Sequence, residues 1–343
     1  MNNELLYLIT FFIAYITALI LTPFFRYIAI KFNIYDRPST PVKTHKVSTP
    51  YLGGLAIWGG WVISLISIRL ITNFPTGTLN NLRSVIIGSL LLLLLGLCDD
   101  IKKGGLGFKF KFLIQIIACL IVVVGFDIRI HFIENYILSV LISIFWIIGL
   151  SNAFNLIDIM DGLSCGTALI SAFFFFIIAL PGEMIYVNFC ALALLASCLG
   201  FLPYNLSKKK KIFMGDTGSL SIGFILATVA LGTSYTKINP VGIFAPLLIL
   251  ATPIYETTFV STIRMLKGKN PFLGSKDHFP LRLEKMGYSR KQILIFVYIL
   301  SFVLGIFAYT IVNLHDNISY LIFSLVIILL VLFSIKISKV KMD

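Results

Sequence analysis

Residues 84–103 read SVIIGSLLLLLLGLCDDIKK. The uninterrupted apolar run up to Cys98 predicts a helix that crosses a membrane, and the charged residues after it predict where that helix reaches water. A strand of a transmembrane β-barrel would instead alternate apolar and polar residues. This stretch therefore predicts a spanning helix with two adjacent carboxylates, Asp99 and Asp100, at one end.

The whole chain has the composition of such helices. Of its 343 residues, 58% are hydrophobic and 13% are charged, whereas an ordinary soluble domain is roughly 45–50% apolar and 25% charged. These values exclude a soluble globular enzyme, a disordered chain and a disulfide scaffold, and they predict an all-α polytopic membrane protein with about 10–11 transmembrane helices. The candidate spans are residues 5–30, 53–72, 84–98, 110–126, 137–156, 163–180, 187–205, 218–235, 241–262, 291–313 and 320–335.

The basic residues fall mainly in alternate connections between these spans. If the N-terminus lies outside, the inner loops carry 23 of the 28 basic residues and the outer loops carry three. Because basic loops stay on the cytoplasmic side, we expect the N-terminus outside and the C-terminus in the cytoplasm. The net charge of +13 then reflects topology and does not require a nucleic acid. The Lys208–Lys211 run is first a topology signal, and a contact to an anionic substrate is the second interpretation.

The acidic residues are few, and a third of them share one expected location. Five of the 15 are predicted at the inner ends of spans: Asp99, Asp100, Asp158, Asp161 and Asp216. A carboxylate costs on the order of 2–3 kcal/mol at the centre of a spanning helix and less near the interface. Negative charge at the C-terminal end of a helix also opposes the helix dipole, which favours a nearby cation. This placement indicates a functional site on the cytoplasmic face.

Two short stretches suggest how these side chains are presented. Asn155, Asp158 and Asp161 recur every third residue, so on a helix they would lie within an arc of about 120° and face one cavity. Gly162 then permits a turn. Asp216 lies between two glycines, in FMGDTGS, before an apolar helix. It would either cap that helix or contribute to an anion site at the helix start.

Clustered carboxylates beside clustered lysines suit phosphoryl-group chemistry. Proteins hold Mg²⁺ with one or two carboxylates plus substrate phosphates, and lysines contact other phosphate oxygens. The sequence has no GxxxxGK[ST] loop and no His/Cys set with zinc spacing, which argues against a P-loop ATPase and a zinc site. A secondary transporter is the alternative from another class, with Glu256 near Pro253 as its deepest carboxylate, but no internal repeat is visible.

In five stretches the chain resembles the polyprenyl-phosphate N-acetylhexosamine-1-phosphate transferase family, glycosyltransferase family 4. The resemblance implies a Mg²⁺-dependent enzyme, with Mn²⁺ as an alternative, in the bacterial inner membrane. It would transfer HexNAc-1-phosphate, first of all GlcNAc-1-phosphate, from a UDP-sugar to undecaprenyl phosphate and release UMP, beginning a cell-envelope polysaccharide such as teichoic acid or lipopolysaccharide. Family analogy also suggests a homodimer. The stretches are residues 36–54 (DRPSTPVKTHKVSTPYLGG), 99–100, 152–162, 213–219 and 264–287.

The resemblance also implies one transferase domain, residues 1–343, and a role for each matching residue. Its active site would use the inner loops at about 31–52, 99–111, 152–162, 206–217 and 263–290. The catalytic carboxylates would be Asp99, Asp100, Asp158 and Asp161, with Asp99 accepting the proton of the lipid phosphate. Asp216 and Asp158 would bind the metal. Lys111 and Gln115 match a polar pair of the family on the fourth span, and Glu256 matches an acidic position of the family. Residues implied to bind substrate are Lys46, Lys102, Lys103, Lys111, Asn155, Asn205, Phe213, Arg264, His278 and Arg282.

The last large inner loop departs from the family. Relatives carry two or three histidines where this chain reads DHFPLRL from Asp277 and keeps only His278. That loop is thought to help read the sugar, so the donor stays open, with phospho-N-acetylmuramoyl-pentapeptide transfer as the alternative within the family. A one-step transfer and a covalent phospho-aspartate route also stay open.

Two local structures are predicted outside the acidic stretches. Residues 127–136 (DIRIHFIENY) alternate apolar and polar residues, which suggests a small β-hairpin. In the last large inner loop, Gly287 would end a short helix that begins near Pro280. Ser289 and Gln292 would then form a capping box at the start of the next span.

Overall fold

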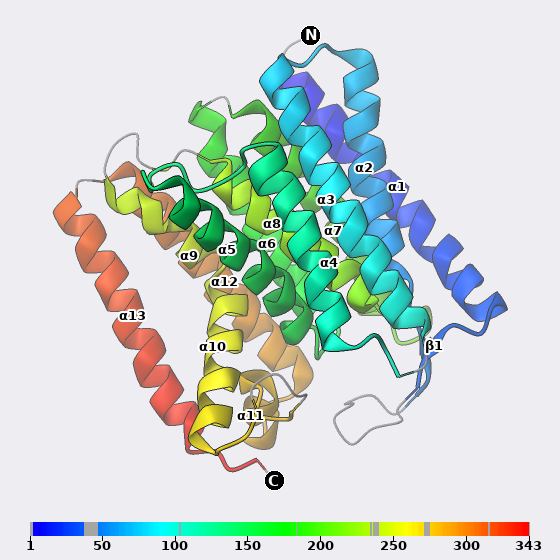
Figure 1. Cartoon of the computed structure of the whole chain (residues 1–343). Helices are drawn as coiled ribbons and strands as arrows, with labels where there is room; N and C mark the ends of the chain where they lie inside the picture. The colour runs from blue at the N-terminus through cyan, green and yellow to red at the C-terminus, as the bar shows by residue number, and fades with distance from the viewer. Residues whose placement is uncertain are drawn as a thin grey trace. The chain divides into compact units, whose positions relative to one another are not determined.

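The computed structural model describes residues 3–37, 47–102, 104–182, 184–233, 235, 240–270, 275–314 and 316–342 (Figure 1). Within these residues, nine helices are long and apolar enough to cross a membrane, and one bent helix pair would make a tenth span. The prediction of an all-α polytopic membrane protein is therefore confirmed, whereas the orientation of the termini stays a prediction. The described residues divide into two compact units, one within Met1–Arg37 and Lys46–Thr233 and the other within Ser234–Asp343.

The first unit is a bundle of antiparallel neighbours. One face of the unit gathers the ends of α1, α3, α5 and α7 and the starts of α2, α4, α6 and α8. Hydrogen bonds between groups at these helix ends show this arrangement. Two short antiparallel strands, β1 (Tyr35–Asp36) and β2 (Thr49–Pro50), lie between α1 and α2. The helices are α1 (Asn3–Lys31), α2 (Gly53–Ile71), α3 (Thr76–Ile101), α4 (Phe108–Leu120) with its π-helical extension Ile121–Gly125, α5 (Tyr136–Ile157), α6 (Leu163–Ala179), α7 (Ile185–Asn205) and α8 (Gly215–Leu231).

Helix α8 is the buried centre of this unit. All its residues from Thr217 to Ala230 are buried, so the helix is enclosed on every side by the other helices of the unit. Small residues bring the neighbouring backbones close to it. A Cβ at Gly54 of α2 or Gly96 of α3 would overlap the backbone at the start of α8, and a Cβ at Gly223 would overlap α5. The start of α8 is thereby fixed against the ends of two other helices.

The second unit contains a broken span. The single span expected at residues 241–262 is instead a 3₁₀-helix (Pro240–Phe244) and α9 (Ala245–Ile249), followed by α10 (Ala251–Leu266) at an angle of 71°. Pro253 has no N–H to donate to the carbonyl of Ile249, so the helical ladder is interrupted there. The other helices of this unit are α11 (Phe279–Lys285), α12 (Arg290–Asn313) and α13 (Asp316–Ser338).

Of the two local predictions, one is confirmed and one is wrong. The capping box of Ser289 and Gln292 is present at the start of α12. Residues 127–136 form no strand. Instead, the N–H of Ile130 donates to the Ser143 hydroxyl at 2.9 Å, and the Ser139 hydroxyl donates to the Ile130 carbonyl at 2.5 Å. Because the groups that would pair two strands bond to α5, no hairpin forms.

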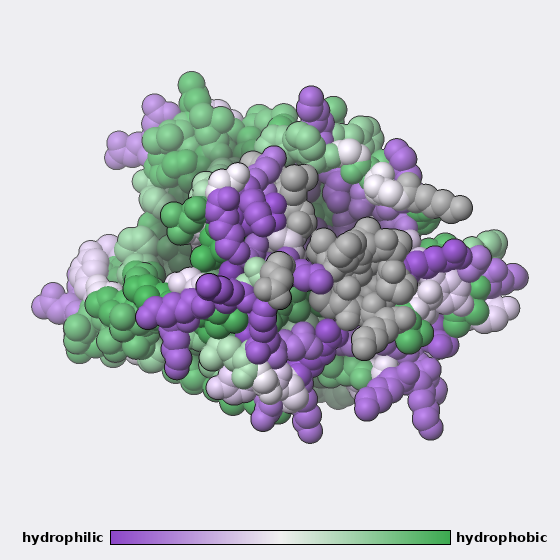
Figure 2. All heavy atoms as spheres, turned by 90° about the horizontal axis from the view of Figure 1, so that it is seen from below, coloured by the Kyte–Doolittle hydropathy of each residue, from purple (hydrophilic) through white to green (hydrophobic). Residues whose placement is uncertain are grey.

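The surface matches a chain that spans a membrane. Large apolar side chains are exposed along the outer helices, as at Leu8, Phe12 and Ile16 of α1. Hydrophilic side chains are prominent in the view from below (Figure 2). An exposed apolar face of this length is stable in lipid and would be unfavourable in water.

Candidate functional site

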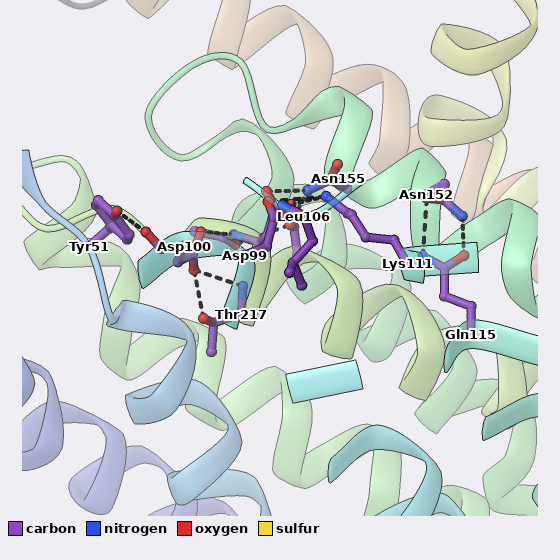
Figure 3. Close-up of polar contacts among 12 residues, drawn as sticks. Tyr51, Asp99, Asp100, Leu106, Lys111, Gln115, Asn152, Asn155 and Thr217 are labelled. Carbon is purple, nitrogen blue, oxygen red and sulfur yellow. Dashed lines mark hydrogen bonds and ion pairs between the residues drawn. The ribbon is translucent and has the colours of Figure 1, made fainter. Parts of the chain in front are cut away.

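The carboxylate of Asp100, at the end of α3, caps the start of α8 (Figure 3). It accepts the N–H groups of Asp216 and Thr217, both at 3.0 Å, and the Thr217 hydroxyl at 2.6 Å. These contacts satisfy donors that have no partner within the helix and place negative charge at its positive end. Gly215 has φ +70, and a Cβ there would overlap the Asp100 carboxylate. Asp216 itself lies in the first turn and is not the cap.

Lys111, on α4, lies between two further carboxylates. Its Nζ atom is 2.7 Å from Oδ2 of Asp216 and 3.1 Å from Oδ2 of Asp99. Asn155, on α5, donates to the other oxygen of Asp216 at 2.8 Å. Asp99 Oδ1 accepts the N–H of Leu106 at 2.5 Å. One ammonium group therefore serves two carboxylates, and it lies where α3, α4, α5 and α8 meet.

The stretch around Asp158 is not helical as the spacing predicted. Helix α5 ends at Ile157, Asp158 has ψ 49, and Gly162 at φ 78 leads into α6. The side chains nevertheless reach the same site. Asp161 pairs with Lys211 at 2.7 Å. Burial of the Asp158 carboxyl group, followed by the charges of Asp216, Asp161 and Asp100, raises its pKa well above the usual range.

Asp158 is the carboxylate of this cluster with the fewest partners for its negative charge. Among the described residues it has no hydrogen-bond or ion-pair partner, although its side chain is half-buried. Within the described part of the chain, the five aspartates of the site face two ion-paired lysines, Lys111 and Lys211. This first-unit cluster of Asp99, Asp100, Asp158, Asp161 and Asp216 therefore carries more negative charge than its paired lysines neutralise.

Two predicted substrate-binding residues, Asn205 and Phe213, have structural contacts around this cluster. Asn205 accepts the N–H of Gly162 at 2.6 Å and donates to the Ile212 carbonyl at 3.0 Å, so it ties two loops together. Phe213 pairs its backbone with Pro50 and Gly53. The ring of Phe213 lies 4.9 Å from the Lys211 ammonium. Lys102 is exposed at the end of α3, whereas Lys46 and Lys103 lie outside the described residues.

Two residues that sequence reasoning missed support Asp100, and Gln115 bonds to a neighbouring helix. The hydroxyl of Tyr51 donates to the backbone carbonyl of Asp100. Burial, followed by the charge of Asp100, raises the pKa of Tyr51 to about 12. Thr217 binds the Asp100 carboxylate, and its position next to Asp216 was the signal available in the sequence. Gln115, which the resemblance groups with Lys111 on α4, exchanges two hydrogen bonds with Asn152, at 2.8 and 3.3 Å.

A second cluster of charged residues lies within the second unit. Glu256, on α10, accepts the N–H of Phe279 at 3.2 Å and lies 2.5 Å from Nδ1 of His278. Asp277 binds Lys267 at 2.6 Å and Arg282 at 3.0 Å. Burial alone would raise the pKa of Asp277, but the hydrogen bond and charge of Lys267 and the charge of Arg282 bring it below the usual range.

The buried arginines of this second cluster are engaged inside the protein. Arg264 donates to the Asn270 carbonyl at 2.8 Å. Arg264 and Arg282 are 6% and 1% exposed. The three residues of this unit that were predicted to bind substrate, Arg264, His278 and Arg282, are thus all bonded to protein groups.

The family of the chain follows from comparison with known proteins. A model of the glycosyl transferase family 4 matches residues 82–234 and thus every aspartate of the first-unit cluster. The chain is 34% identical over 309 residues to a probable undecaprenyl-phosphate N-acetylglucosaminyl 1-phosphate transferase of Bacillus subtilis (strain 168), covering 88% of this chain and 83% of the relative. The chain belongs to glycosyl transferase family 4. The prediction of this family is confirmed.

Two further relatives are also similar to the chain. Identity is 27% over 319 residues to a decaprenyl-phosphate N-acetylglucosaminephosphotransferase of Mycolicibacterium smegmatis, covering 83% of this chain and 78% of that one. Identity is 39% over 202 residues to a phospho-N-acetylmuramoyl-pentapeptide-transferase of Limosilactobacillus reuteri, covering 54% and 61%. Of these three relatives, the one from Bacillus subtilis covers the largest share of both chains.

Proposed function

We propose that this protein transfers GlcNAc-1-phosphate from UDP-GlcNAc to undecaprenyl phosphate and releases UMP. The relative from Bacillus subtilis, which matches over most of both chains, supports this acceptor and this sugar. The observation that carries the proposal is Lys111, held between Asp99 and Asp216 beside the uncompensated Asp158. Such a site suits two phosphorylated substrates that repel each other. The setting would be the cytoplasmic face of a bacterial inner membrane, as the first membrane step of a cell-envelope polysaccharide.

The proposed reaction divides the work between the two adjacent aspartates. An oxygen of the lipid phosphate attacks the β-phosphorus of the UDP-sugar, and the bond from that phosphorus to the UMP oxygen breaks. Asp99 is the candidate to accept the proton of the lipid phosphate, because its carboxylate shares Lys111 with Asp216. Asp100 is committed to the start of α8 by three hydrogen bonds, so we assign it a positioning role. Lys111 would contact phosphate oxygens in place of one carboxylate.

The residues present fit a magnesium ion. No group of three or more His, Cys, Asp or Glu side chains is spaced as a complete metal site within the described ranges. Mg²⁺, however, is commonly held by one or two carboxylates together with substrate phosphates. Asp158 and Asp216 are the carboxylates we propose for it, with Mn²⁺ as an alternative. A bound Mg²⁺ would neutralise the charge on the departing UMP.

The test is UMP release by purified protein with undecaprenyl phosphate, Mg²⁺ and a panel of UDP-sugars, with and without EDTA. We expect UMP from UDP-GlcNAc and loss of that activity in EDTA. Release only from UDP-N-acetylmuramoyl-pentapeptide would replace the donor and favour the alternative within the family. Folded protein that binds UDP but releases no UMP from any donor would overturn the proposal.

A further inference from the structure

The segment that leads into α2 pairs with the segment that leads into α8. Phe213 donates its N–H to the Pro50 carbonyl at 2.9 Å, and its own carbonyl accepts the N–H of Gly53 at 3.0 Å. The N–H of Gly54 donates to the Met214 carbonyl, also at 3.0 Å. The first N–H groups of a helix have no partner within it, and here the carbonyls in front of α8 supply one. The two helix starts are thereby bonded to each other.

Glycine at both donor positions of α2 lets the two backbones approach this closely. A Cβ at Gly53 would lie 2.7 Å from the carbonyl oxygen of Phe213. A Cβ at Gly54 would overlap the backbone nitrogen of Gly218, in the first turn of α8. A side chain at Gly54 would therefore displace that turn.

Tyr51 joins this pairing to the end of α3. Its backbone lies beside Phe213 in a parallel bridge, and its hydroxyl donates to the backbone carbonyl of Asp100 (Figure 3). The Asp100 carboxylate in turn accepts the N–H groups of Asp216 and Thr217 at the start of α8. The contacts form a closed ring, which runs from Tyr51 to Asp100, on to the start of α8, and back to Tyr51 through Phe213.

Asp216 is a member of this ring, and its carboxylate contacts groups of the first-unit cluster. One oxygen is 2.7 Å from Nζ of Lys111, and the other accepts a hydrogen bond from Asn155 at 2.8 Å. A displacement of the helix start by about 1 Å would take either contact beyond hydrogen-bond range. The position of Asp216 relative to Lys111 therefore depends on how firmly the start of α8 is held.

We infer that residues 50–54 are a positioning segment, which keeps Asp216 within reach of Lys111. The segment does so in two ways, because its backbone pairs with the residues before α8 and Tyr51 holds the end of α3. The inference rests on the proposed function, since it takes Asp216 and Lys111 to act on the substrates. The segment itself needs no contact with a substrate. Its loss should slow the reaction more than it weakens donor binding.

The first test compares Tyr51→Phe with a matched control, Tyr204→Phe. Tyr204, on α7, also donates its hydroxyl to a carbonyl of another helix, that of Leu19 on α1 at 3.3 Å, but it is not a member of the ring. Tyr51→Phe should lower kcat for UMP release about tenfold and change the KM for UDP-GlcNAc less than about threefold, because reacting groups are misplaced. Tyr204→Phe should leave both constants within about twofold. Both constants are measured per folded protein, well below each unfolding midpoint, so lower stability alone cannot produce the split.

A second pair of variants uses two glycines of α2. In Gly54→Ala the added methyl group meets the backbone of α8, and kcat should fall about 100-fold. In Gly59→Ala it meets the end of the Leu21 side chain, 2.8 Å from the Cβ position, which can change rotamer. That control should keep kcat within about threefold. Equal losses in the two variants would contradict the contact with α8 as the cause, and if Gly54→Ala does not fold, Tyr51→Phe decides.

Hydrogen exchange gives a readout that needs no activity. In Tyr51→Phe, amide exchange should rise in residues 213–219, because the start of α8 is held less firmly, and Tyr204→Phe should leave it unchanged. Unchanged exchange there in folded Tyr51→Phe would overturn the positioning segment. Raised exchange with an unchanged kcat would overturn its link to the reaction. If the wild type releases no UMP, the proposed function fails, and exchange still decides whether the segment holds the start of α8.

Discussion

Both units bring a carboxylate from one helix to the first N–H groups of another, but the charges around that carboxylate differ. In the first unit, Asp100 caps α8 while Asp158 lacks a partner among the described residues and Lys111 is shared. In the second unit, Glu256 meets α11 and His278, and Asp277 has two cations of its own. Among the residues that the structure describes, the first cluster has fewer ion-paired cations than carboxylates, and the second is balanced.

This difference favours a ligand site in the first unit and a structural network in the second. Buried carboxylates without matching cations destabilise a fold, so their presence favours a function that supplies positive charge or uses the negative charge. A carboxylate with two cations and several backbone partners needs nothing more. Sequence position alone would not have distinguished them, because both clusters lie in stretches that resemble the family.

The largest expected effect comes from removing the positive charge of Lys111 from the first cluster. Lys111→Ala would leave Asp99 and Asp216 facing each other without their shared ammonium. We expect turnover to fall by about 10²–10³, the usual loss for one charged contact to a reacting group. UMP release at saturating UDP-GlcNAc measures this. The control is Lys109→Ala, an exposed lysine on the same helix, which should retain near-normal turnover.

Turnover of Lys111→Ala within about threefold of the wild type would contradict the central role of this lysine. Folding is checked separately by the midpoint of thermal unfolding in detergent, because two facing carboxylates also reduce stability.

The second prediction removes a charge from the balanced cluster. The pKa of Asp277 lies below its usual value in the folded protein. The ionised group therefore stabilises the fold above its unfolded pKa of about 3.9, and this stabilisation is lost as the pH falls through the lower folded pKa. We expect Asp277→Asn to cost about 1–3 kcal/mol at pH 7, since two charged hydrogen bonds weaken.

The pH dependence is the specific check. The difference in unfolding midpoint between wild type and Asp277→Asn should be constant from pH 7 to about pH 5 and shrink below pH 4. Glu284→Gln, which loses an exposed pair with Arg290, is the control and should change the midpoint much less. An equal difference at pH 7 and pH 3 would show that the charge of Asp277 is not what stabilises the loop.

The sequence predicted which aspartates come together better than it predicted the contacts that each of them makes. Five aspartates at the inner ends of spans were enough to expect Asp99, Asp100 and Asp216 on one face. The capping role of Asp100 depends on how closely α3 approaches α8 at Gly96, and no local pattern reports that distance. Tyr51 was missed for the same reason, since its partner is 49 residues away.

Where a periodic pattern continued past a break, the predictions failed. The three-residue spacing from Asn155 to Asp161 continues although α5 stops at Ile157. The apolar run at 241–262 continues across the bend before α10. In both places the periodicity of the side chains does not report where the helix is interrupted. Tertiary contacts determine the end of α5, and a proline contributes to the bend before α10.

The smallest expected effect is a gain in stability when one carboxylate is removed from the first cluster. Asp158→Asn removes a charge that faces three other carboxylates, while the size of the side chain is kept. In EDTA we expect the midpoint of thermal unfolding to rise, by an amount equivalent to about 0.5–2 kcal/mol. With Mg²⁺ present, the variant should lose the UMP release that the wild type shows. Added Mg²⁺ should reduce the difference in unfolding midpoint between the variant and the wild type, because it would bind the folded wild type more tightly than the variant.

The matched control for this change is Asp161→Asn. It removes the same charge from the same turn, but Asp161 has an ion pair with Lys211 at 2.7 Å and Asp158 has no such pair among the described residues. The two variants should therefore shift the midpoint in opposite directions in EDTA, with Asp161→Asn losing stability. If Asp158→Asn also lost stability, the turn would hold both carboxylates for structural reasons, and Asp158 would have to be withdrawn as the carboxylate reserved for a cation.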